Sequence, residues 1–351
     1  MSTDAATPVA YRDALNQALR EELARDPDVF LLGEDIAGFD GAFKVTRGLV
    51  DEFGPERVVD TPISEAGFTG LAIGAALTGL RPVVEIMTVN FAILAMDQIV
   101  NNTAKIHYMF GGQVSVPMVI RMPGGAGHQL SSQHSQTLDA WFAHVPGLKV
   151  VCPSTPEDAK GLLKTAIRDD DPVIFIENEG LYGKKGPVGG PDDLIPFGQA
   201  VVRRAGTHCT VIAHSRMVWV ALQAADELAA QGIEVEVVDP RTFRPLDLDT
   251  LAGSVRRTGH AVIVDEGWPE YGISAGLATQ LTRPMGASTV QTSPCRTRRT
   301  WSRRHCPSRH TWRPPSSPTS AGRSPDARDA HAQAVGHHGG GHRPPLAQSR
   351  R

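Results

Sequence analysis

The sequence predicts an α/β protein of two domains with mostly parallel sheets, and three observations support that prediction. Short runs rich in β-branched residues alternate with segments of helical periodicity, which is typical of strands joined by helical crossovers. A chain of 351 residues is long enough to build two hydrophobic cores. A stretch rich in glycine and proline interrupts the alternation around residues 180–197.

The first alternating region predicts one domain over residues 1–185. Strands are expected over Val29–Gly33, Pro82–Met87, Pro117–Arg121, Lys149–Cys152 and Val173–Glu177. Helices are expected over Tyr11–Ala24, Ile63–Leu80, Ile93–Ile106 and Pro156–Ile167. The last of these helices has a clear start, because Thr155 can cap it, Pro156 suits its first position and two acids follow.

A second domain is expected over residues 201–284, after a linker over residues 186–200. Its strands are expected over Thr210–Ala213, Val235–Val238 and Ala261–Val264. Its helices are expected over Val218–Ala230, Asp247–Arg256 and Ile273–Thr282.

Residues 285–351 show neither helical nor strand periodicity and are expected to be a disordered tail. From Gly286 onward the chain has twelve Arg, no Lys and two acids, whereas the preceding part has 36 acidic and 23 basic residues. Back-translating Val290–Arg298 and shifting the reading frame by two nucleotides permits the string Ala-Asp-Val-Pro-Met-Pro-Tyr-Ala. We therefore hypothesise a frameshift near Arg283–Thr289, which would leave the second domain incomplete.

The composition limits the classes of function. The formal net charge of −3 gives no electrostatic case for nucleic-acid binding, and no aromatic or groove-reading pattern accompanies the arginines of the tail. The four cysteines form no CxxC pair, which fits a reducing compartment. The apolar run Ala66–Leu80 is too short to span a bilayer, and the first residues do not resemble a secretory signal. A cytoplasmic protein without a membrane partner is expected.

Glu65 is the most informative residue. It begins a helical stretch, Phe68–Leu80, that contains no charged residue. A carboxylate at the start of an apolar helix is costly to bury, and a buried carboxyl with a raised pKa can exchange protons near neutral pH. The simpler interpretation is a carboxylate placed there only for the helix dipole.

Two further segments contain candidate site residues. Met87 and Phe91 follow an expected strand, where ligands of open α/β sheets gather, although a lone aromatic residue is more often part of the core. The loop Gly124–Gln136 carries His128 and His134, which could also be ordinary surface histidines. It lacks the phosphate-loop and GxGxxG patterns. The string Gly272–Gly276 fits GxSxG but lacks the strand-turn-helix context of serine hydrolases.

Taken together, residues Val9–Thr282 resemble the beta subunits of the thiamine-diphosphate-dependent pyruvate dehydrogenase component of 2-oxoacid dehydrogenase complexes. The segments that carry the resemblance are Asp60–Glu65, Asn90–Phe91, Gln133–Gln136, Pro146–Val151, Ile167–Asp169, Glu177–Glu179 and Val264–Trp268. The resemblance implies a transketolase-like pyrimidine-binding domain followed by a transketolase C-terminal-like domain. The shifted-frame string also resembles the usual C-terminal segment of the family.

The resemblance implies roles for four residues. Glu65 is expected to hydrogen-bond N1′ of the cofactor's aminopyrimidine and so to promote loss of the thiazolium C2 proton. Met87 and Phe91 are expected to pack against the aminopyrimidine. His134 is the expected acid–base group during transfer of the acyl group to lipoyllysine.

The resemblance also implies a potassium site and partner chains. The potassium ligands would be Met118, Ala166, Ile167, Asp169 and Asp171, mostly through backbone carbonyls, with the alternative that this is an ordinary helix-to-strand turn. Asp171 stands where the family commonly has Asn. The magnesium-diphosphate signature is missing, because Phe39 precedes Asp40-Gly41 where a glycine is needed. An alpha subunit in an α2β2 tetramer is therefore expected to hold magnesium and the diphosphate, and the chain alone to be inactive.

The implied reaction is oxidative decarboxylation of pyruvate with transfer of the acetyl group to lipoyllysine on a dihydrolipoyl acetyltransferase core. Acetoin or branched-chain 2-oxoacids remain alternative substrates. Another alternative is a non-catalytic chain, because the hypothetical frameshift would damage the second domain.

Overall fold

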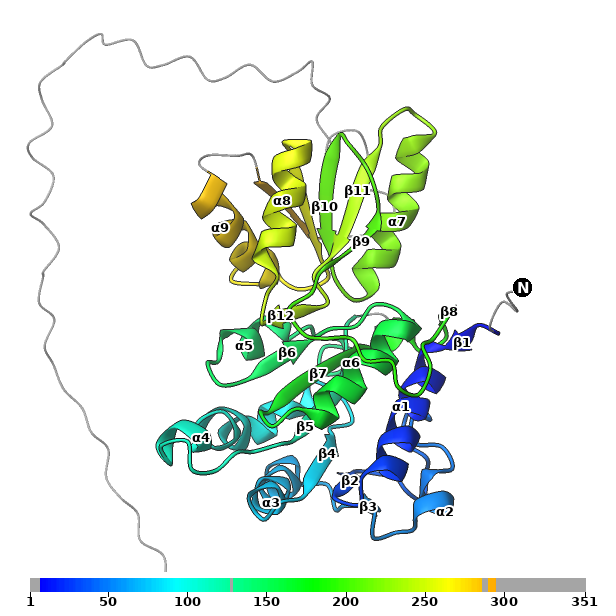
Figure 1. The fold of residues 1–351 in the computed structure, drawn as a ribbon, viewed down its shortest axis with the longest axis vertical. Helices are drawn as coiled ribbons and strands as arrows, with labels where there is room; N and C mark the ends of the chain where they lie inside the picture. Colours follow the sequence, from blue (N-terminus) through cyan, green and yellow to red (C-terminus); the bar gives the residue numbers. More distant parts are fainter. Residues whose placement is uncertain (1–6, 127–128, 286–289, 295–351) are drawn as a thin grey trace, which may run out of the picture. The chain divides into compact units, whose positions relative to one another are not determined.

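The computed structural model describes residues 7–126, 129–285 and 290–294, and these form two main sheets, each covered by helices on both faces (Figure 1). The first sheet has the strand order β12-β6-β7-β5-β4-β2-β3 and is parallel except for the β12–β6 pair. Its strands are β2 (Val29–Gly33), β3 (Val58–Asp60), β4 (Arg81–Glu85), β5 (Val119–Gly124), β6 (Lys149–Val151), β7 (Val173–Asn178) and β12 (Thr242–Arg244).

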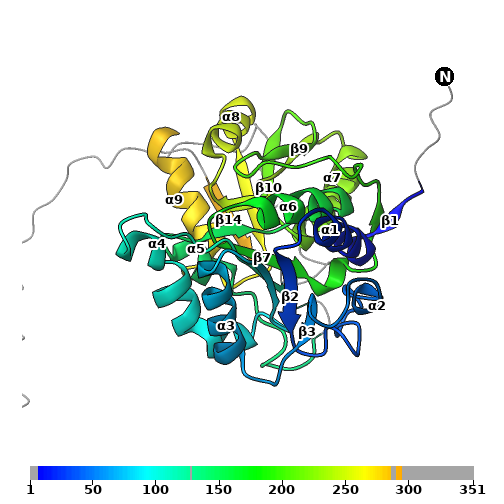
Figure 2. The same cartoon turned by 60° about the horizontal axis from the view of Figure 1, so that its bottom comes forward.

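Two helical layers cover this sheet (Figure 2). On one face lie α1 (Tyr11–Arg25), α2 (Leu49–Phe53) and α6 (Pro156–Arg168), and their core includes Leu15, Leu19 and Leu162. On the other face lie α3 (Glu65–Leu77), η1 (Phe91–Ala95), η2 (Gln98–Thr103) and α5 (Asp139–His144), with Phe68 and Phe142 in their core. A small antiparallel pair joins β1 (Val9–Ala10) to β8 (Lys185–Gly186).

The predicted start of α6 is confirmed in detail. The Thr155 hydroxyl accepts from the Asp158 backbone N–H at 3.1 Å, and the Asp158 carboxylate accepts from the Thr155 backbone N–H at 3.2 Å. This reciprocal capping satisfies two backbone donors that the first helical turn leaves free.

The prediction of one helix over Ile93–Ile106 is wrong. The segment is the 3-10 turn η1, then the π-helical turn η2, then the short helix α4 (Ile106–Met109). Ala92, Ala95 and Ile99 nevertheless remain buried on one side. The spacing of apolar residues identifies the buried face of such a segment. It does not distinguish an α-helix from the tighter 3-10 helix or the wider π-helix.

The second sheet has the strand order β14-β13-β10-β11-β9 and is parallel except for the β11–β9 pair. Its strands are β9 (Val201–Arg204), β10 (Cys209–Ala213), β11 (Val235–Asp239), β13 (Ala261–Asp265) and β14 (Val290–Pro294). Helix α7 (Arg216–Ala229) packs on one face, and α8 (Leu248–Thr258) and α9 (Ile273–Met285) pack on the other (Figure 1). The predicted α/β class with mostly parallel sheets is confirmed.

The segment expected as a linker lies along α6. The Thr165 hydroxyl donates to the Ile195 carbonyl at 2.8 Å, and the Lys160 ammonium donates to the Gly189 carbonyl at 3.0 Å. A Cβ on Gly161 would come within 2.6 Å of the Ile195 side chain, so the close approach requires glycine. The segment is thereby fixed to the first domain. Of the expected tail over residues 285–351, Val290–Pro294 form β14 of the second sheet, whereas residues 286–289 and 295–351 lie outside the described residues. The hypothetical frameshift position, Arg283–Thr289, falls partly at the end of α9 and partly in the undescribed residues 286–289.

Candidate functional site

Three carboxylates gather at the carboxyl edge of the first sheet. Glu34 directly follows β2, Glu85 ends β4, and Glu65 is the first residue of α3. The register pairs Gly33 with Glu85, and the Thr61 N–H donates to the Gly33 carbonyl at 2.9 Å, which brings the end of β3 to the same place. Ligands of open α/β sheets bind at such an edge.

Glu65 is buried, with 4% of the residue exposed. Its place in the first turn of α3 favours a negative charge, because the free N–H groups of a helix N-terminus point toward it. Among the described residues, no N–H or O–H group donates a hydrogen bond to its carboxylate. The carboxyl is therefore free to bind another group.

Glu34 is a further candidate site residue, which the sequence alone did not indicate. Burial, together with the nearby charges of Glu65 and Asp35, raises the pKa of Glu34 from 4.5 to about 7. Repulsion by a neighbouring carboxylate favours the neutral, protonated form of Glu34. An acid directly after a strand was the only signal in the sequence, and that signal is common.

Several buried polar atoms near these carboxylates have no hydrogen-bond partner. They are Glu34 Oε1, Thr61 Oγ1, Thr69 Oγ1 and Asn90 Nδ2. Thr69 lies one helical turn after Glu65 on α3, and Asn90 directly precedes η1, which packs on α3. An unpaired buried polar group costs about 1–3 kcal/mol, so this arrangement suits a bound polar group such as an aminopyrimidine.

The structure brings Phe91 and His134 together. Their ring centroids are 5.4 Å apart at an interplanar angle of 85°, an edge-to-face contact. Phe91 also packs on the core of α3, whereas the His134 side chain is exposed. Met87 is half-buried in the turn between β4 and Phe91. The sites predicted at 87, 91 and 134 are thus neighbours in space or in the chain.

A buried ionic network lies beneath this edge. Arg121 on β5 donates two hydrogen bonds of 2.8 Å to the Glu177 carboxylate and also pairs with Glu85. The Tyr182 hydroxyl donates to Glu177 at 2.6 Å. Burial raises the pKa of Glu85, although the Arg121 charge opposes the shift. The network fixes the end of β4, from which Met87 and Phe91 continue.

The residues predicted to bind potassium lie at the opposite edge of the sheet. Met118 directly precedes β5, Asp171 precedes β7, and Ala166, Ile167 and Asp169 lie at the end of α6. These are strand starts, whereas Glu65 and Phe91 lie at strand ends. A potassium ion there would be structural and would not contact Glu34, Glu65 or Glu85.

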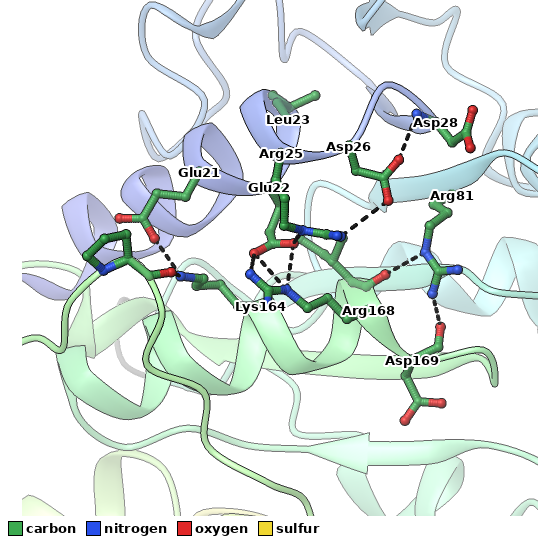
Figure 3. A network of polar contacts seen from close by, with 12 residues as sticks. Glu21, Glu22, Leu23, Arg25, Asp26, Asp28, Arg81, Lys164, Arg168 and Asp169 are labelled. Atoms are coloured by element: carbon green, nitrogen blue, oxygen red, sulfur yellow. Dashed lines mark hydrogen bonds and ion pairs between the residues drawn. The ribbon is translucent and has the colours of Figure 1, made fainter.

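Two cationic side chains already bind this turn. The Arg81 guanidinium donates to the carbonyls of Ile167 at 3.0 Å and Asp169 at 2.6 Å (Figure 3). The Lys149 ammonium lies 2.7 Å from the Asp169 carboxylate and 3.1 Å from that of Asp171. Each carbonyl keeps a second lone pair that a potassium ion could use. The described residues contain no group of three or more His, Cys, Asp or Glu side chains arranged to hold a metal.

Comparison with known proteins identifies two domains. Residues 7–185 match the transketolase pyrimidine-binding domain, and residues 198–294 match the transketolase C-terminal domain. A solved structure described as a split gene transketolase, inactive beta4 tetramer, covers 82% of this chain and 89% of its own with a TM-score of 0.68. Its identity is 24%, so it supports the fold alone.

Closer relatives are mitochondrial pyruvate dehydrogenase E1 component beta subunits. The protein from Caenorhabditis elegans is 52% identical over 284 residues, which is 80% of this chain and 81% of the relative. The Bos taurus protein is 51% identical over 79% of this chain and 78% of its own length. The Homo sapiens protein is 51% identical over the same two shares, 79% and 78%.

These relatives contradict the predicted cytoplasmic location, because they are mitochondrial proteins. The prediction rested on the lack of a secretory signal and of paired cysteines. Those features separate oxidising from reducing compartments, but they do not distinguish one reducing compartment from another. In the described part of the chain, every helix is too short or too polar to cross a bilayer.

Proposed function

Because the chain belongs to the family of pyruvate dehydrogenase E1 component beta subunits, we propose that it oxidatively decarboxylates pyruvate together with an alpha subunit and passes the acetyl group to lipoyllysine. The observation that carries the proposal is the buried Glu65 at the start of an apolar helix, beside a second buried carboxyl, Glu34. Both residues lie in the part of the chain, residues 7–185, that matches the transketolase pyrimidine-binding domain.

The bound thiamine diphosphate would supply the electron sink for decarboxylation, which no side chain provides. Glu65 would hold a proton at ring nitrogen N1′, and the unpaired buried atoms around it would bind the polar edge of the ring. Phe91 and Met87 would orient the ring by packing. His134, in contact with Phe91, would donate or accept a proton during acetyl transfer.

The alpha subunit would provide magnesium and the binding site for the diphosphate, because Phe39-Asp40-Gly41 lacks the first glycine of that signature. The expected assembly is an α2β2 tetramer docked on a dihydrolipoyl acetyltransferase core. We further propose that a potassium ion binds the turn formed by Met118, Ala166, Ile167, Asp169 and Asp171. Carbonyl oxygens suit this ion, and it would brace the start of β7.

The test is dye reduction by the purified chain, by an alpha subunit, and by their mixture, each with thiamine diphosphate and magnesium. We expect activity only in the mixture, and a higher kcat/KM for pyruvate than for acetoin or branched-chain 2-oxoacids. A higher kcat/KM for acetoin would overturn the choice of substrate. A mixture that forms a complex but oxidises none of these compounds would overturn the proposed function.

A further inference from the structure

The position of His134 depends on the loop that carries it, and the importance of that position rests on the proposed function. We define the histidine loop as Gln129–Leu138, which leads into α5. Gln129 and Ser131 have φ values of 52° and 88°, in the region that non-glycine residues avoid. Such residues cost about 1–3 kcal/mol each and persist only where the surroundings hold them. The contacts that hold this loop come in part from the second domain.

The first contact is at the end of the loop. Asp139, the first residue of α5, lies with its carboxylate 3.3 Å from Nε2 of His214, which follows β10 of the second domain. The same nitrogen lies 3.9 Å from the Asp265 carboxylate, and the imidazole meets the Phe243 ring edge to face at 4.8 Å. His214, Asp139 and Asp265 are each 5% exposed or less. The His214 imidazole therefore lies between Asp139 of the first domain and Asp265 of the second.

The second contact involves Glu266, directly after β13. Its carboxylate accepts from Asn178 Nδ2 at 2.9 Å and from Arg216 Nη1 at 2.7 Å. A Cβ on Gly125 would lie 2.5 Å from that Asn178 nitrogen and 3.1 Å from Glu266, so the end of β5 is pressed against this cluster. The Gly125 N–H donates to the Gln136 carbonyl at 3.1 Å, which ties the histidine loop to it.

A third observation supports the same arrangement. A Cβ on Gly267 would lie 3.6 Å from the Thr137 methyl group, so the backbone after Glu266 packs on the loop between its two contacts. His134 itself has only the edge of Phe91 as a ring partner among the described residues. Its position therefore depends on the anchoring of the loop.

We propose that His214 and Glu266 are positioning residues: from the second domain they hold the histidine loop so that His134 is placed for acetyl transfer. The second domain then serves the site directly, in addition to any part in assembly. Acetyl transfer depends on this placement, whereas decarboxylation depends on Glu65 and Glu34, which the loop does not carry. The two half-reactions should therefore respond differently to loss of the anchors.

The experiment compares His214→Gln and Glu266→Gln with wild type, each in complex with the alpha subunit. The matched control is Trp219→Phe. It removes a different hydrogen bond between the domains, which the Trp219 indole N–H donates to the Ser154 carbonyl at 2.7 Å. This hydrogen bond does not involve the histidine loop. Dye reduction with pyruvate reports decarboxylation, and acetylation of a free lipoyl domain reports transfer. Hydrogen–deuterium exchange of residues 129–138 reports the loop.

Both anchor variants should lower kcat for lipoyl acetylation by about tenfold or more, with a much smaller fall in dye reduction and faster exchange in the loop. Glu266→Asp, which keeps the charge, should recover part of the transfer rate. Trp219→Phe should leave the ratio of the two activities unchanged. If His214→Gln does not fold, Glu266→Gln decides alone, because Glu266 lies nearer the surface.

The positioning role would be overturned if hydrogen–deuterium exchange of the histidine loop were unchanged in the anchor variants. It would also be overturned if dye reduction and lipoyl acetylation fell by the same factor, as in a general loss of stability. A wild-type complex without pyruvate-dependent dye reduction would instead overturn the proposed function. The exchange measurement remains valid in that case, so the two failures are distinguishable.

Discussion

At the scale of single residues, the site depends on two buried carboxyls that influence each other. Glu65 could be predicted from the sequence, because an acid precedes a long uncharged helix. Glu34 could not, because its importance comes from its burial and from the charge of Glu65, which lies elsewhere in the sequence. His214 was missed for the same reason, since its partner Asp139 is 75 residues away.

Replacing Glu34 should change the pH dependence of stability. The pKa of Glu34 is raised from 4.5 to about 7, so its stabilising contribution is complete below pH 4.5 and is lost as the pH rises through 7. Glu34→Gln removes the buried charge above that range. We expect its melting temperature to exceed that of wild type by a few degrees at pH 8, and the difference to shrink by pH 5.

Thermal unfolding at both pH values checks this, with Asp51→Asn on the exposed face of α2 as a control. A difference between Glu34→Gln and wild type that is the same at pH 5 and pH 8 would contradict the assignment.

At the scale of elements, the carboxyl edge of the first sheet requires a close approach of β2 and β4. A Cβ on Gly33 would lie 2.5 Å from the Glu85 carbonyl oxygen, which is backbone and cannot move aside. The strands were predicted from their β-branched runs, but their order and this contact could not be, because pairing depends on long-range packing. The strand β12, which joins the first sheet from the second half of the chain, was missed for that reason.

Gly33→Ala should therefore destabilise the protein by about 1–3 kcal/mol. The control is Gly253→Ala in α8, where an added Cβ meets nothing within 4 Å and should stabilise by about 0.5–1 kcal/mol. Urea unfolding of both variants gives the comparison. Equal stabilities of the two variants would contradict the described approach of the strands.

The turn between α6 and β7 makes a separate prediction. A potassium ion that binds only the folded state would raise the melting temperature. We expect a higher value in potassium chloride than in choline chloride at equal ionic strength, since ionic screening is then the same. Identical melting temperatures would show that Arg81 and Lys149 brace the turn without the ion.

At the scale of the whole molecule, the two-domain organisation and the family were evident from the sequence, because both depend on local patterns repeated along the chain. The cytoplasmic location was wrong, and the roles of the second-domain residues were not foreseen. Within the described residues, β14 lies at one edge of the second sheet. An uncovered edge strand favours aggregation.

The hypothetical frameshift leads to a prediction about yield. A gene in which the Ala-Asp-Val-Pro-Met-Pro-Tyr-Ala frame is restored should give more protein in the soluble fraction than the 351-residue chain, because the second domain would be complete. Expression of both forms under one promoter, followed by quantification of the soluble fraction, checks this. Equal yield and equal activity of the two forms would refute the damage to the second domain.

The most direct test of the account is the rate of carbon dioxide release from pyruvate by the complex of this chain with an alpha subunit, measured for wild type and Glu65→Gln. Loss of a positioned proton-transfer group lowers rates by about 100- to 10,000-fold. We predict a loss of at least about 100-fold, with complex formation unchanged. A Glu65→Gln complex that releases carbon dioxide at the wild-type rate would contradict the central claim that Glu65 is the catalytic carboxyl.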